Sequence, residues 1–170
     1  MRRVIWNTFR VLVVLAVLIA ITVFLVGRDN MLETALGPVQ RTDVVFAILE
    51  LPERPNTYLI CPVDYCGTPP ARISPVFDLP ASDLRARWEQ MMKREPRVIL
   101  NGATPDGLQF DYVQRSAVFR FPDTITIRFI PLGNDRSTLA IYSRSHYGHS
   151  DLGVNRDRIE RWLAQIPQPR

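Results

Sequence analysis

The sequence has 170 residues, enough for one domain of ordinary size plus an appendage. Its formal net charge of +4 arises at the N-terminus, because four of the 21 basic residues lie in or beside one apolar stretch and the other 17 match the 17 acidic residues. The rest of the chain is therefore formally neutral and lacks the basic surface that a nucleic-acid-binding protein needs, so we expect no nucleic-acid partner.

The first element is an apolar stretch near the N-terminus. VLVVLAVLIAITVFLV, from Val11 to Val26, contains no charged residue, no glycine and no proline. As a helix it covers about 24 Å, and the residues from Val4 extend this to the ~30 Å of a bilayer's hydrocarbon core. A signal peptide would be followed by small residues in an A-x-A-like cleavage site, which Gly27-Arg28-Asp29 does not offer. We expect a retained transmembrane anchor over residues 1–28, with a cleaved signal peptide as the alternative.

The charges beside this stretch predict its orientation. Arg2, Arg3 and Arg10 precede its apolar core, whereas Arg28 alone follows and is offset by Asp29. The positive-inside rule places the N-terminus in the cytoplasm. We therefore expect a single-pass protein of the bacterial inner membrane whose C-terminal domain is periplasmic, with the membrane as its first partner.

A linker is expected over residues 29–56. It begins with a short helix at Met31–Leu36, which Gly37-Pro38 would end. The apolar run Asp43–Leu51 is rich in β-branched residues, which predicts a strand or a packed extended segment.

Two cysteines follow in CPVDYC. Cys61 and Cys66 are close in sequence, and in an oxidising compartment such a pair is most simply a disulfide. The alternative is half of a zinc site, completed by His146 and His149.

Residues 57–167 have the periodicity of an α+β domain. Four strands are predicted, beginning near Arg97, Gly107, Thr124 and Thr138. A helix precedes them, with an apolar stripe of Leu84, Trp88, Met91 and Met92. A second helix, from about Arg156, follows them. The predicted fold is an antiparallel meander sheet packed on one face by two helices, preceded by a single N-terminal transmembrane helix.

The loop before the last helix holds the most suggestive residues. In RSHYGHSDLGVNRDRIERWL, Ser150 and Asp151 suit a side-chain-to-backbone turn and Gly153 suits a positive φ. Asn155 is a favoured N-cap for the helix that follows. This structural interpretation accounts for more of the loop's residues than any other.

A ligand site at the same place is the competing interpretation. The start of the last helix offers backbone N–H groups to an anion, with several arginines nearby. Alternation also places Arg115 and Arg120 on a strand near Arg144, although these arginines could instead pair with Asp111, Asp123 and Asp151. The candidate ligand- or anion-binding residues are Arg115, Arg120, Arg144, Ser150, Asp151, Gly153, Asn155 and Arg156.

A metal-dependent enzyme or hydrolase is the alternative function. His146, His149 and Asp151 could supply two imidazoles and a carboxylate, although no rigid element fixes their geometry. Neighbours in one loop cannot easily form a catalytic triad, and the sequence contains no phosphate loop, G-x-G-x-x-G or H-E-x-x-H motif. We therefore expect no cofactor.

Several segments together resemble the DUF1499 family, a bacterial and plastid group of uncharacterised function. These are PNTYLICP with Cys66, SPVFDLPA, PRV, QRSAVFRFPD and the loop just described. The resemblance covers about Asp43 to Ile166, and many members carry an N-terminal membrane segment. It implies that the loop's framework positions are Ser143, Arg144, Gly148, Ser150, Asp151, Gly153 and Asn155.

The resemblance implies no reaction. Other residues often fill the positions of His146 and His149 in the family, which argues against a family-wide metal role. We expect a membrane-anchored module of the cell envelope that binds a lipid, a small anionic ligand or an envelope protein, rather than an enzyme.

Overall fold

The computed structural model describes residues 2–27, 34 and 37–166. The chain divides into two compact units, Met1–Gln40 and Arg41–Arg170. Apart from Thr34, the helix expected at Met31–Leu36 lies outside the described residues.

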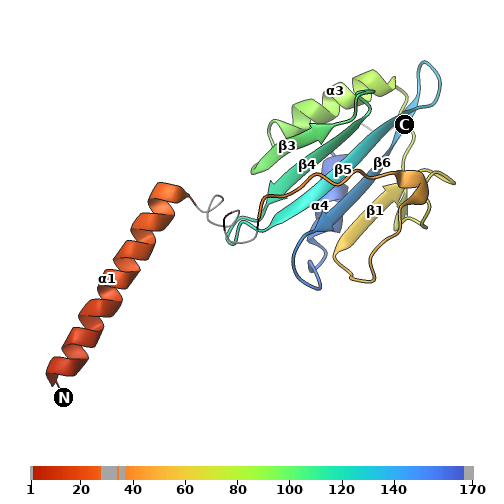
Figure 1. The fold of residues 1–170 in the computed structure, drawn as a ribbon. Coiled ribbons are helices and arrows are strands. Elements are labelled where there is room, and N and C mark those ends of the chain that lie inside the picture. The colour runs from red at the N-terminus through yellow and green to blue at the C-terminus, as the bar shows by residue number, and fades with distance from the viewer. Residues whose placement is uncertain (1, 28–33, 35–36, 167–170) are drawn as a thin grey trace. The chain divides into compact units, whose positions relative to one another are not determined.

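The first unit consists of one long apolar helix, α1 (Arg2–Val26), drawn in red in Figure 1. Its stretch Arg3–Phe24 is long and apolar enough to cross a membrane. The hydroxyls of Thr8 and Thr22 donate to backbone carbonyls one turn earlier, at 3.0 Å and 2.8 Å, so these polar groups are satisfied within the helix. Internal satisfaction of this kind is what a hydrocarbon environment requires.

The second unit is built on a six-stranded sheet with the order β2-β1-β6-β5-β4-β3 (Figure 1). The strands are β1 (Thr57–Cys61), β2 (Arg72–Ile73), β3 (Val98–Ala103), β4 (Gln109–Arg115), β5 (Pro122–Pro131) and β6 (Ser137–Ser145). The four strands from β3 to β6 form the predicted antiparallel meander. The first strand closes back on the last, because β1 pairs antiparallel with β6.

The predicted α+β class is confirmed, but the prediction of a fully antiparallel sheet was wrong. Strand β2 pairs in parallel with β1, so the sheet is mixed. The chain between Cys61 and Arg72 loops back so that Arg72 and Ile73 lie beside Ile60 and Cys61, the last two residues of β1, and both strands run in the same direction. Short edge strands in a proline-rich coil have no alternating apolar pattern, which is why the sequence did not indicate β2.

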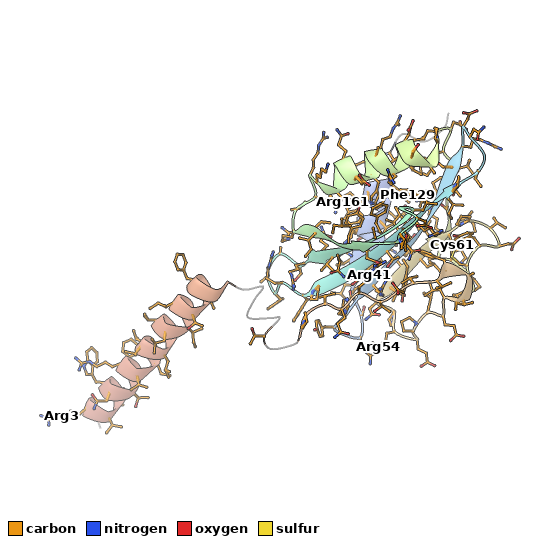
Figure 2. The ribbon with its side chains drawn as sticks, turned by 45° about the horizontal axis from the view of Figure 1, so that its top comes forward. Arg3, Arg41, Arg54, Cys61, Phe129 and Arg161 are labelled. Carbon is orange, nitrogen blue, oxygen red and sulfur yellow. A yellow bond between two sulfur atoms is a disulfide. The ribbon has the colours of Figure 1, made fainter. Side chains whose placement is uncertain are left out.

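Two helices cover one face of the sheet, as predicted. They are α3 (Ala81–Met92) and α4 (Val154–Leu163). The rings of Trp88 and Trp162 meet edge to face at 5.7 Å between the helices. Phe129 of β5, labelled in Figure 2, lies in the same core, with its ring 6.4 Å from that of Trp88. This helix-covered face is called the inner face below.

The opposite, outer face is covered by the segment Arg41–Leu51, which we call the strap. Phe46 and Val44 are buried against Leu59, Ala140 and Tyr142. The strap contains a short 3₁₀ helix, η1 (Phe46–Ile48), instead of the strand considered for this apolar run. Because the strap covers this face, outward-facing side chains such as Thr126 are fully buried there.

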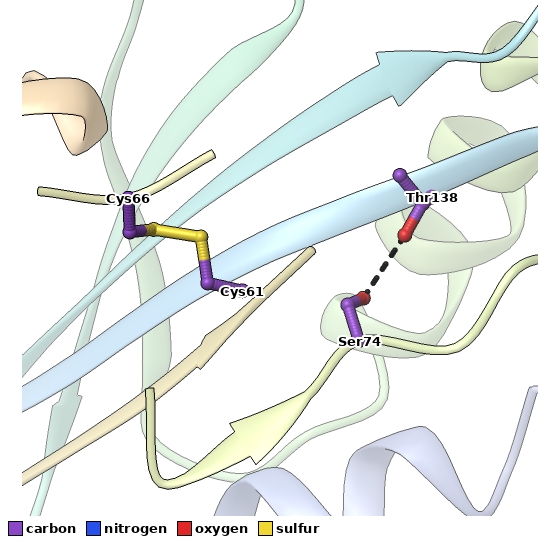
Figure 3. Close-up of a disulfide and its surroundings, with 4 residues drawn as sticks. All are labelled: Cys61, Cys66, Ser74 and Thr138. Carbon is purple, nitrogen blue, oxygen red and sulfur yellow. Dashed lines mark hydrogen bonds between the residues drawn. A yellow bond between two sulfur atoms is a disulfide. The ribbon is translucent and has the colours of Figure 1, made fainter. Parts of the chain in front are cut away.

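A disulfide holds the coil between β1 and β2, as predicted from the cysteine spacing. It joins Cys61 and Cys66, whose Cα atoms are 6.3 Å apart (Figure 3). The next residue, Gly67, donates its N–H to the carbonyl of Phe46 at 2.9 Å. The disulfide therefore fixes the coil against the 3₁₀ turn of the strap.

Candidate functional site

A buried polar cluster joins α4 to three strands on the inner face. Arg158, only 6% exposed, forms an ion pair with Asp123 of β5. Its guanidinium also donates to Gln114 Oε1 of β4 at 2.5 Å and to Ser143 Oγ of β6 at 3.1 Å. Asn155 Oδ1 accepts from the same guanidinium at 2.8 Å. The positive charge of Arg158 is therefore paired with a carboxylate inside the protein. The cluster holds α4 on the sheet and is not accessible to a ligand.

The side chain of Asn155 belongs to this cluster, so its expected role as N-cap of α4 was wrong. It is completely buried, and its Nδ2 donates to the carbonyl of Asn56 and to Ser145 Oγ, both at 3.0 Å. The N-cap position is Gly153, with φ of 84°, and the helix begins at Val154, two residues earlier than expected.

Asp151 provides the side-chain contacts at the start of α4. Its carboxylate accepts the backbone N–H of Gly153 at 3.1 Å and that of Asn155 at 2.7 Å. A negative charge is favourable at a helix N-terminus. Two of the N–H groups that the anion-site interpretation required are therefore occupied by the protein's own carboxylate.

A second polar chain crosses the outer face of the sheet. Arg41 Nε donates to Asp111 Oδ2 at 2.8 Å, and Thr126 Oγ1 donates to Asp111 Oδ1 at 2.6 Å. The same hydroxyl accepts from Arg144 Nη1 at 3.1 Å, and the Arg144 guanidinium lies 4.9 Å from the centre of the Tyr142 ring. Asp111 is only 1% exposed, and its charge is compensated by Arg41.

Arg144 lacks a direct carboxylate partner within the part of the chain that the structure describes, since no Asp or Glu oxygen lies within 4.0 Å of its guanidinium. Burial lowers the pKa of Arg144 below its ordinary value, while Tyr142 and Asp111 act in the opposite direction. A partly desolvated guanidinium of this kind is a strong donor for an anion.

His146 lies beside this arginine. Its Nε2 is 2.5 Å from Thr124 Oγ1. Desolvation of the ring and then the charge of Arg144 lower the pKa of His146, and Asp123 partly offsets them. The imidazole is therefore predominantly neutral at pH 7 and adds no full positive charge beside Arg144.

The outer face is hollowed between the strap and β6, a feature we call the outer groove. Its volume is about 360 Å³, and its walls include Val45, Ile48 and Leu49 of the strap and Tyr142 of β6. Arg144 forms its polar end, and Asp43 and Glu50 also line it. The outer groove therefore combines apolar walls with one guanidinium and two carboxylates.

A larger hollow, of about 820 Å³, lies on the other side of the strap. Two of its polar lining residues are bound inside the protein: Arg128 pairs with Asp106, and Gln109 Nε2 donates to the carbonyl of Val44 at 2.9 Å. It is the less suitable of the two for a ligand.

The other predicted site residues are dispersed. Arg115 ends β4, with β5 between it and β6, and its Nη1 donates to the carbonyl of Arg120 at 3.3 Å. Ser150 Oγ accepts the N–H of Leu152, and Arg156 pairs with Asp157. Of the predicted ligand-binding residues, only Arg144 lines the outer groove.

The histidines of the enzyme hypothesis do not form a metal site with their neighbours. Among the described residues, no group of three or more His, Cys, Asp and Glu side chains could hold a metal ion. His146 instead contacts Thr124, and His149 lies on the exposed loop.

Comparison with known protein families shows which family the chain belongs to. A family model described as "Protein of unknown function (DUF1499)" matches residues 47–166. The chain belongs to the DUF1499 family. No curated protein and no solved structure matches it.

The matched region begins inside the strap and ends at Ile166, a buried residue of the inner core. The DUF1499 part of this chain thus begins inside the 3₁₀ turn and contains all six strands and both helices of the second unit. Its most recognisable residues have structural contacts: Asp123 of the FPD segment pairs with Arg158, and Ser143 and Asn155 complete the inner cluster.

Sequence reasoning missed the pairing of Asp111 with Arg41. Asp111 lies in the alternating strand segment FDYV, where a carboxylate among apolar residues signals a buried charge that needs a partner. Arg41 supplies that partner from a segment far away in sequence, and no local pattern indicates such a pairing.

Proposed function

We infer that this DUF1499 protein is a single-pass inner-membrane protein whose periplasmic domain binds an amphiphile with an anionic group in the outer groove. The location rests on three features: the apolar helix Arg3–Phe24, the three arginines before its apolar core, and the disulfide. Disulfides form and persist outside the cytoplasm, so the pairing of Cys61 with Cys66 supports the same orientation.

The observation that carries the binding proposal is the state of Arg144. Its guanidinium is oriented by Tyr142 and Thr126 and has no carboxylate within 4.0 Å among the described residues. A fixed and partly desolvated cation loses little entropy when it accepts an anion.

The walls of the groove indicate the rest of the ligand. Ile48 and Val45 are exposed apolar residues of the strap, beside the aromatic ring of Tyr142. Asp43 and Glu50 disfavour a compact, highly charged anion, because their carboxylates would repel it. An apolar body with one phosphate or carboxylate placed at Arg144 satisfies both constraints, and membrane lipids have this chemistry.

Native mass spectrometry of the full chain in detergent tests the proposal, with phosphatidylglycerol added as the anionic probe and phosphatidylcholine as the comparison. We expect bound phosphatidylglycerol on the wild type. Arg144→Ala removes a charge-assisted contact worth about 1.5–3 kcal/mol, so its binding should fall roughly 10- to 100-fold.

Arg87→Ala is the matched control, because Arg87 is an exposed arginine of α3 that does not line the outer groove. It should retain wild-type binding. Equal binding by the wild type and Arg144→Ala would refute the site. No bound lipid on the wild type would favour a role in protein assembly instead.

A further inference from the structure

The loops at one end of the sheet expose an apolar patch that lies outside the outer groove. In the loop between β4 and β5, Phe119 is 69% exposed, and Val118 beside it and Phe121 at the end of the loop are also exposed. The β6–α4 loop exposes Tyr147. The rings of Phe119 and Phe121 stack at 5.8 Å, and those of Phe121 and Tyr147 lie 5.9 Å apart.

These four residues, Val118, Phe119, Phe121 and Tyr147, form what we call the aromatic tip. Both loops leave the sheet at the same end, because Arg115 pairs with Pro122 and Asp123 pairs with Ser145. Leu152, 92% exposed, is a further apolar side chain on the second loop. Soluble surfaces rarely gather exposed aromatic residues in this way without a partner.

The backbone at both loops is held in an unfavourable conformation. Arg120, between the two phenylalanines, has φ of 61°, and Leu152 has φ of 54°. A residue other than glycine loses about 1–2 kcal/mol in this left-handed region. The fold thus sustains strain in the two loops that display these side chains.

We propose that the aromatic tip inserts into the headgroup region of the membrane that holds α1. Aromatic side chains with neighbouring arginines are the composition that favours a membrane–water interface. Arg156, whose side chain is 62% exposed, follows the second loop, so it can approach anionic lipid headgroups.

The length of the tether permits this contact. Residues 27–40 connect α1 to the second unit and span at most about 50 Å when fully extended. The chain meets the sheet at Arg41, which binds Asp111, and Asp111 lies four residues, or about 13 Å, before the end of β4 at the tip. If α1 spans a bilayer, the tether is therefore long enough for the aromatic tip to reach the surface of that bilayer.

The proposal shares the membrane anchor with the proposed function but does not require a ligand in the outer groove. Its test uses the full chain in nanodiscs that hold one copy, with a bimane fluorophore attached at Phe119→Cys. Nanodiscs contain phosphatidylcholine and phosphatidylglycerol, with or without doxyl-labelled lipid as quencher. The matched control carries the label at Leu132→Cys, in the exposed hairpin at the opposite end of β5.

We expect doxyl lipid to reduce the fluorescence at position 119 roughly twofold or more and to leave position 132 unchanged. Adding Tyr147→Ser and Phe121→Ser should reduce the quenching, whereas Arg144→Ala should not. Equal quenching at both positions, or none at position 119, overturns the proposal. In a second preparation with two copies per nanodisc, a blue shift of the emission at position 119 that one-copy nanodiscs lack, with no effect of doxyl lipid, also overturns the proposal and indicates self-association.

Discussion

Arg144 and Arg158 lie near each other in sequence but have opposite surroundings. Arg158 is buried on the inner face and pairs with Asp123, so its charge contributes to holding α4 on the sheet. Arg144 projects from the outer face, where Tyr142 supports it and no carboxylate within the described chain contacts it. One arginine therefore has a structural role, whereas the other is available to a ligand.

The first prediction concerns the buried arginine. Arg158→Ala should lower the free energy of unfolding by about 3 kcal/mol, because it leaves Asp123 without its partner. Urea unfolding in detergent, followed by the fluorescence of the buried Trp88 and Trp162, measures the change.

Arg156→Ala provides the control, since this exposed arginine pairs with the exposed Asp157 and its loss should change stability by about 0.5 kcal/mol or less. Combining Arg158→Ala with Asp123→Asn should recover part of the loss, because the unpaired charge is removed. A loss of stability in Arg158→Ala no larger than in Arg156→Ala would contradict the structural role.

At the scale of elements, local sequence patterns predicted the central strands and both helices of the second unit but missed the strap. Alternation in TITIRFI identified β5, and the apolar stripe with Trp88 identified α3, because each pattern reports one buried face. The strap contacts the sheet through only a few buried residues around a 3₁₀ turn, so it has no such period. Thr126 lies on the opposite face of β5 from the core residues Ile125 and Ile127, yet the structure buries it completely beneath the strap side of the sheet.

The second prediction concerns the attachment of the strap. A methyl group added at Gly67 would lie 2.7 Å from the carbonyl oxygen of Ala47 and 3.0 Å from the Cα of Ile48, so the 3₁₀ turn would have to move. We expect Gly67→Ala to increase hydrogen exchange in the strap peptides while the central strands keep their protection.

The exposed Val63 in the same coil supplies a control, since Val63→Ala removes no buried contact and should leave exchange in the strap unchanged. Because the strap forms one wall of the outer groove, Gly67→Ala should also weaken lipid binding. Unchanged exchange in Gly67→Ala would mean that the strap is held by other contacts.

At the scale of the whole molecule, the sequence predicted the long apolar N-terminal helix, the α+β class and the disulfide, since each depends on composition or spacing. The candidate site was predicted only in part. Arg144 is one of the predicted ligand-binding residues and lines the outer groove, but its contacts depend on Tyr142, Thr126 and the strap. These residues meet because β5 pairs with β6 and because the strap crosses the outer face of the sheet. Local sequence patterns do not specify such contacts between distant segments.

The last prediction tests the orientation of the whole protein. If Arg2, Arg3 and Arg10 hold the N-terminus in the cytoplasm, the second unit is exported and Cys61–Cys66 becomes oxidised in the cell. Full chain denatured without reductant should then have no free thiol that reacts with a maleimide. Replacing the three arginines with glutamate should leave a large fraction of the chains with two reactive thiols, whereas Arg28→Glu should not. Two reactive thiols in the wild type would contradict the orientation, because the pair would then have been synthesised and kept in a reducing compartment.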